Sequence, residues 1–127
     1  MQNQIRGTAF FLLASLYTFQ VHAQDISEEP VIICAAEAYS LDGLIAALEK
    51  NGTKIPAEMS DTIRNWSDAL ANVAVSDPSD SERGMALYNL SSSRKAELFS
   101  EANQGDLQSV VDGRIALIQQ CIADHVP

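Results

Sequence analysis

Apolar residues recur at helical spacing in the segment between residues 30 and 52. They are separated by four, three, four and three positions, and they are Cys34, Ala38, Leu41, Ile45 and Leu48. This spacing places them in one stripe along a helix. Pro30 suits a first helical turn, where a missing N–H costs least, and Lys50 and Gly52 form a stop signal. The pattern predicts a helix, although Gly43 allows a break near Ser40.

A second segment, from residue 56 to residue 73, has the same apolar spacing. Its apolar residues follow the same four-three-four-three spacing, and they are Met59, Ile63, Trp66, Leu70 and Val73. Pro56 suits the first turn of this helix, and Glu58 favours its positive end. The acidic stretch 76–81 then has the composition of a turn. Ser79 and Glu82 have the spacing of a capping box, which predicts the start of a third helix.

The last two helical regions complete the pattern. The third carries Met85, Leu87, Tyr88, Leu90, Ala96, Phe99 and Ala102, and its serines 91–93 leave open whether residues 80–103 form one kinked helix or two short ones. Asp106 is a good N-cap for the final helix. That helix has a broad apolar stripe, made of Leu107, Val110, Val111, Leu117, Ile118, Cys121 and Ile122. No segment alternates like a strand, so we predict an all-α fold, a small antiparallel bundle of four helices, or five.

The two cysteines lie at opposite ends of this helical sequence. Cys34 falls near the start of the first helix and Cys121 near the end of the last, and both lie on apolar stripes. In an up-down-up-down bundle, these two places are neighbours. We therefore predict a Cys34–Cys121 disulfide that closes the bundle; two separate thiols, or an intermolecular bridge, are the alternatives.

The first 23 residues have the layout of a secretory signal peptide. Arg6 precedes an uncharged apolar run, and the small residues Val21 and Ala23 occupy the positions before a cleavage site. The alternative is a retained membrane anchor, for which the run is short. We predict residues 1–23 as the signal and 24–127 as a single helical domain, periplasmic or secreted. We expect no other stretch to cross a membrane.

The predicted mature chain is strongly acidic. It holds all seventeen acidic residues and seven of the eight basic ones, a difference of −10. This charge argues against nucleic acid, because phosphate binding needs a positive surface, and against anionic lipid. It favours solubility and attracts basic partners. We therefore expect no nucleic-acid partner, and no membrane partner once the signal is cleaved.

The chain contains few candidate catalytic residues. His125 is the only histidine of the mature chain, and it lies two residues from the end. A bridged cysteine is no nucleophile, and no serine lies in a nucleophile-elbow pattern. Asp77, Asp80 and Glu82 lack the alternation of a calcium loop, and turn formation and capping explain them. No haem attachment motif is present. We expect no catalytic activity, no metal and no cofactor.

Three glycosylation sequons occur, at Asn51, Asn65 and Asn89. They matter only if the chain comes from a eukaryote, and the sequence does not identify the source.

Two features bear on partner contacts. The acidic turn 76–81 is expected to protrude from a rigid scaffold, which makes Asp77 and Asp80 candidates for contact with a partner. Trp66 lies on the stripe of the second helix, so we expect it in the core.

Two short patches carry a resemblance. "CAAEAY" at residues 34–39, Trp66, and "QQCIADH" at residues 119–125 resemble the periplasmic immunity proteins that block peptidoglycan amidases delivered by type VI secretion. The resemblance implies a small, exported, disulfide-bonded helical protein without catalysis. It also implies an inhibitor, often dimeric, that plugs the active site of a toxin. The expected partner is therefore another protein, an enzyme, and a homodimer is compatible with this resemblance.

A second resemblance leads to a different function. "LIQQC", residues 117–121, is similar to the region of the second cysteine in acid-stress chaperones of the bacterial periplasm. In acid, protonation would take the net charge of the mature chain from about −10 to about +8, and self-repulsion would loosen the fold. We expect an exported protein-binding domain. An inhibitor of a cell-wall-degrading enzyme is the first hypothesis, a chaperone the second, and a secreted structural or interaction protein the third.

Overall fold

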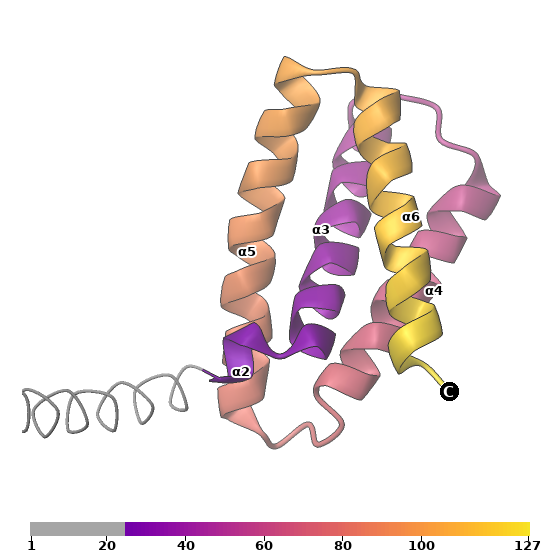
Figure 1. Cartoon of the computed structure of the whole chain (residues 1–127). Coiled ribbons are helices and arrows are strands. Elements are labelled where there is room, and N and C mark those ends of the chain that lie inside the picture. The colour runs from indigo at the N-terminus through magenta and orange to yellow at the C-terminus, as the bar shows by residue number, and fades with distance from the viewer. Residues whose placement is uncertain (1–24) are drawn as a thin grey trace, which may run out of the picture.

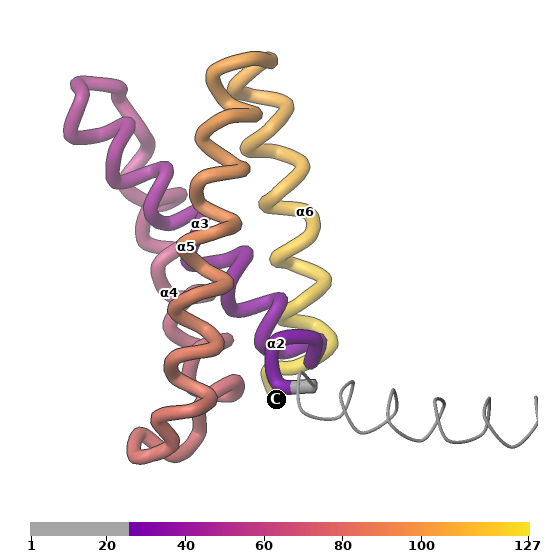
Figure 2. Tube along the Cα trace, turned by 90° about the vertical axis from the view of Figure 1, so that its left-hand side faces the viewer, coloured from indigo at the N-terminus to yellow at the C-terminus, as the bar shows by residue number. Residues whose placement is uncertain are grey.

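The computed structural model describes residues 25–127, a region that contains five helices and no strand. The helices are α2 (Asp25–Glu28), α3 (Pro30–Lys50), α4 (Ala57–Ala74), α5 (Ser81–Gln104) and α6 (Leu107–His125). The four long helices run alternately up and down, and α2 and the C-terminus lie at the same end of the bundle (Figures 1 and 2). The predicted all-α antiparallel bundle is confirmed. The predicted signal, residues 1–23, lies outside the described residues.

Helix α3 is the central element of the bundle. It packs against α4, α5 and α6, and Figure 1 shows it between α5 and α6. Its buried apolar residues lie nearly all round the helix, and they are Ile32, Ala35, Ala36, Ala38, Leu41, Leu44 and Ile45. The predicted stripe of α3 was therefore correct but too narrow.

This central position explains the composition of α3. Pro30–Lys50 is long and apolar enough to cross a membrane, and more than half of its apolar window is buried inside the bundle. By length and composition this helix would qualify as a span, so the expectation that no stretch after the signal crosses a membrane stays a prediction. Packing on several sides requires apolar residues on several sides, so a core helix and a span share this composition.

The ends of α3 follow the sequence signals. Pro30 is its first residue, and Gly52 has a φ of 92°, a left-handed conformation that suits glycine after a helix. Gly43 does not break the helix. It instead lets the side chain of Lys95 on α5 lie close, since a Cβ at Gly43 would meet Lys95 Cε at 3.2 Å.

The N-terminus of α5 differs from the prediction by one residue. Asp80 is the N-cap, and its carboxylate accepts a hydrogen bond from the backbone N–H of Arg83 at 3.1 Å. Ser79 instead donates its N–H and its hydroxyl to Asp77, at 3.0 and 2.7 Å. The predicted Ser79–Glu82 capping box is therefore wrong, because aspartate is an equally good N-cap and stands one position later. Asp106 caps α6 as predicted, accepting from Gln108 N–H at 3.3 Å.

Helix α5 is a single helix through its three serines, which settles whether residues 80–103 form one helix or two. Its buried residues are Leu87 and Leu98, whereas Met85 and Tyr88 are exposed. Val73 near the end of α4 is exposed too. These three residues were predicted on apolar stripes and lie on the surface. The face of α5 that points toward the core includes polar residues such as Ser91. Apolar spacing alone therefore does not identify this face.

Candidate functional site

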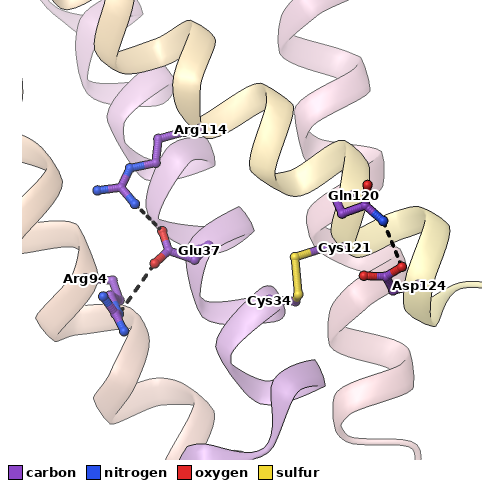
Figure 3. Close-up of a disulfide and its surroundings, with 7 residues drawn as sticks. All are labelled: Cys34, Glu37, Arg94, Arg114, Gln120, Cys121 and Asp124. Atoms are coloured by element: carbon purple, nitrogen blue, oxygen red, sulfur yellow. Dashed lines mark hydrogen bonds and ion pairs between the residues drawn. A yellow bond between two sulfur atoms is a disulfide. The ribbon is translucent and has the colours of Figure 1, made fainter.

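The predicted disulfide is present. Cys34 and Cys121 are bonded, their Cα atoms lie 5.7 Å apart, and 87 positions separate them in the sequence. The bond joins the early part of α3 to the late part of α6 (Figure 3). No cysteine remains free within residues 25–127. A disulfide of this kind is typical of proteins in oxidising compartments.

A buried glutamate lies on α3 close to the disulfide. Glu37 is only 5% exposed, and Figure 3 shows its carboxylate between arginines from two other helices. Arg114 of α6 donates from Nη1 to Glu37 Oε2 at 3.0 Å, and Arg94 Nε of α5 lies 3.5 Å from Oε1. Arg114 also reaches Glu101 Oε2 at 2.9 Å. Burial of a charge is costly unless opposite charges and hydrogen bonds compensate it, and both are present here.

This cluster connects α3, α5 and α6, and it was not predicted from the sequence. Glu37 was not on the predicted stripe of this helix. The signal was available, because Glu37 is the single charge within the apolar run from Val31 to Leu41. A lone acid in such a run requires a basic partner from another segment.

An open groove lies between α3 and α5, and we call it the tyrosine groove. Its volume is about 340 Å³, and it is lined by Tyr39, Gly84, Leu87, Tyr88, Ser91, Ser92 and Lys95. Tyr39 is 38% exposed and Tyr88 is 67% exposed, so both rings reach solvent. Small residues on α5, namely Gly84, Ser91 and Ser92, leave room beside the rings.

Two carboxylates that do not line the tyrosine groove act electrostatically on Tyr39. Burial raises the pKa of the Tyr39 phenol, and the carboxylates of Asp68 and Asp42 raise it further. Burial also raises the pKa of Asp42; the positive charge of Arg64 opposes this, and Asp68 and Glu49 add to it. Within residues 25–127, neither the Asp42 carboxylate nor the Asp68 carboxylate makes a hydrogen bond or an ion pair.

Lys95 occupies the far end of the groove on α5. Its Nζ lies over the Phe99 ring, 5.7 Å from the centroid. Its side chain also lies close to Gly43. Lys95 stands seven positions after Tyr88, about two turns further along α5.

The acidic turn 76–81 holds the two residues predicted for partner contact. Asp77 accepts both hydrogen bonds from Ser79, and Asp80 caps α5. Both carboxylates therefore have local structural roles, and their contact role stays a prediction. In the described part of the chain, no group of three or more histidine, cysteine or acidic side chains is placed to hold a metal ion.

The acidic turn 76–81 allows a testable prediction about the pKa of Asp77. The two hydrogen bonds from Ser79 lower the pKa of Asp77. A lowered pKa means that the carboxylate helps to hold the turn above the pKa of the unfolded chain, and that this help is lost as the pH falls through the folded value. Ser79→Ala should raise the pKa of Asp77 toward its ordinary value, measured by carboxyl carbon NMR. Ser81→Ala is the matched control, and an unchanged titration of Asp77 in Ser79→Ala would contradict the prediction.

The remaining candidate residues are dispersed. His125 is the last residue of α6 and is half-buried. The three sequon asparagines are all exposed: Asn51 in the turn after α3, Asn65 on α4 and Asn89 on α5. Trp66 is partly buried and packs against the core, as expected.

No protein-family profile, curated protein sequence or solved structure matches the chain. The two resemblances therefore rest on the sequence patches that carry them.

Proposed function

We propose that the mature chain is an exported, non-catalytic protein-binding domain that inhibits a cell-wall-degrading enzyme. The observation that carries this proposal is the tyrosine groove, with two exposed tyrosines from different helices of a disulfide-closed bundle. Met85 on α5, three positions before Tyr88, is also exposed at 59%. Tyrosine and methionine are enriched at protein interfaces, where tyrosine contributes a large apolar area with a polar end. The acidic surface would attract a basic partner.

The proposed function predicts capture of an enzyme. Immobilised residues 24–127 should retain a cell-wall-degrading enzyme from a periplasmic or secreted fraction at neutral pH. The same protein in solution should then inhibit that enzyme at a one-to-one ratio. An unrelated acidic protein of similar net charge is the control for non-specific binding. Retention of nothing at neutral pH, or retention of an enzyme whose activity does not change, would contradict the proposal.

The strongly acidic composition favours the chaperone as a second candidate. In acid, protonation of its seventeen carboxylates would take the net charge of the mature chain from about −10 to about +8, and self-repulsion would loosen the bundle. A loosened bundle exposes apolar surface that could bind unfolded clients. This hypothesis predicts suppression of client aggregation at pH 2–3 and none at pH 7. Aggregation that proceeds equally with and without the protein at pH 2–3 would exclude it.

A further inference from the structure

We propose that the tyrosine groove binds an extended segment of the partner that carries an apolar side chain and, three positions away, a carboxylate. This inference rests on the proposed function and names the part of the enzyme that the groove would recognise. It is carried by the charge of the groove lining, by the placement of Lys95 and by the apolar surface beside the two tyrosines.

The lining of the groove carries one charge, and that charge is positive. Lys95 is the charged residue among those that line it. Its ammonium group makes no hydrogen bond or ion pair within residues 25–127, although the mature chain holds seventeen acidic residues. Tyr39, Tyr88 and Ser92 add hydroxyl groups to the lining, and a hydroxyl can donate to a carboxylate. The charge of the groove is therefore complementary to an anion.

The side chain of Lys95 is placed by contacts that leave its charge unpaired. It lies beside Gly43 of α3, where a Cβ would meet Lys95 Cε at 3.2 Å and Nζ at 3.5 Å. Its Nζ also lies over the Phe99 ring, 5.7 Å from the centroid. Glycine is less favourable than alanine inside a helix, but here it leaves the room that the lysine occupies. The ammonium group is thus positioned without an acidic partner.

The apolar part and the charged part of the groove lie about 10 Å apart. Tyr88 and Lys95 are seven positions apart on α5, which is about 10 Å along the helix. Tyr39 lies between them, because its neighbour Ser40 donates to the Ser91 carbonyl at 3.4 Å. An extended peptide advances about 3.3 Å per residue, so three positions cover the same distance. An apolar side chain at the tyrosines therefore places a carboxylate near Lys95.

The tyrosine end of the groove supplies the apolar surface. Its apolar lining consists of the two tyrosine rings and Leu87, which is 8% exposed. Gly84 leaves open space beside them, since a Cβ there would meet no atom within 4 Å. An aromatic side chain of the partner would bury apolar area here and pack against another ring.

Nearby acidic residues determine which end takes the carboxylate. Asp42 and Asp68 act electrostatically on Tyr39 and do not line the groove. They would repel an anion bound at the tyrosines, so the apolar residue belongs there and the carboxylate at Lys95. A second copy of this chain is a poor occupant, because each mature chain carries seventeen acidic and seven basic residues and two copies repel each other.

The test uses four short peptides against the isotope-labelled mature protein. The first is acetyl-Phe-Gly-Gly-Glu-amide; the others replace its glutamate with glutamine or lysine, or its phenylalanine with alanine. Amide shifts in NMR spectra should saturate with the first peptide and concentrate on Tyr39, Leu87, Tyr88 and Lys95. The glutamine peptide should bind about threefold more weakly, the scale of one exposed ion pair, and the lysine peptide more weakly still. The alanine peptide should give no saturable shifts.

Variants locate the binding. Lys95→Met keeps the apolar stem and removes the charge, so it should bind the glutamate and glutamine peptides equally. Tyr88→Ala should weaken both at least about threefold, and Tyr88 is exposed enough for its loss to leave the core intact. Asp42→Asn removes a repulsive charge and should bind the glutamate peptide at least as tightly as the wild type. Lys54→Met, exposed and outside the groove, is the matched control and should keep the preference for glutamate.

Several outcomes would overturn the inference. These are shifts spread over the whole surface, equal binding of the glutamate and glutamine peptides by the wild type, and a preference for glutamate that survives in Lys95→Met. Weaker binding of the glutamate peptide by Asp42→Asn would also contradict it. A dimer in sedimentation that Tyr88→Ala dissociates would assign the groove to a second copy instead.

The groove and the proposed function can fail separately. An enzyme inhibited equally by the wild type, Lys95→Met and Tyr88→Ala would refute the groove inference and leave the proposed function standing. Localised binding of the glutamate peptide without any captured enzyme would uphold the groove and contradict the inhibitor.

Discussion

Replacing Cys34 and Cys121 together with alanine is expected to lower the free energy of unfolding by about 2–4 kcal/mol. The disulfide spans 87 positions of the sequence, so it restricts most of the unfolded chain. In a domain of this size, such a loss corresponds to a fall in melting temperature of roughly 10–25 °C. Urea unfolding of the mature protein, followed by circular dichroism, measures the free energy directly.

Reduction provides the control for the disulfide prediction. A reducing agent should bring the wild type down to the stability of the double alanine variant and should leave that variant unchanged. A loss below about 1 kcal/mol would show that packing alone closes the bundle, since this is less than the usual contribution of a native disulfide.

Arg114→Leu is expected to destabilise the fold by about 2–4 kcal/mol. The change removes the hydrogen-bonding partner 3.0 Å from Glu37 Oε2, and the glutamate is too buried for water to replace it. Arg94 Nε remains 3.5 Å from Glu37 Oε1, so the loss of stability is smaller than it would be for a buried charge with no partner. Denaturant unfolding at neutral pH gives the difference.

Two further variants separate the buried pair from its exposed neighbour. Glu101→Gln removes only the half-exposed partner of Arg114 and should cost less than about 1 kcal/mol. The double variant Glu37→Leu with Arg114→Leu should be more stable than Arg114→Leu alone, because no buried charge is left uncompensated. If Arg114→Leu and Glu101→Gln cost the same, Glu37 does not depend on Arg114.

Much of the fold could be predicted from the sequence because apolar spacing reports which helix faces are buried. The stripe of α3, the cap at Asp106 and the Cys34–Cys121 pairing follow from local spacing and from helix order. These features require no knowledge of which side chains meet across the bundle.

The rest depends on contacts between segments distant in the sequence. Glu37 is stable in the core only because Arg94 and Arg114, 57 and 77 positions away, reach it. The surface position of Tyr88 depends on how α5 is rotated against α3, and apolar spacing could not fix that rotation. The tyrosine groove was therefore not predicted, although Tyr88 was among the apolar residues of the predicted third helical region.

The position of the disulfide also determines how a mechanical load passes through the molecule. Tension applied to the two ends of the mature chain enters α3, crosses the sulfur atoms and leaves through the end of α6. Helices α4 and α5 lie inside the covalent loop and carry none of this load. A single protease cut in any turn between α3 and α6 likewise leaves the two pieces covalently joined. The bond therefore makes the bundle tolerant of pulling and of nicking.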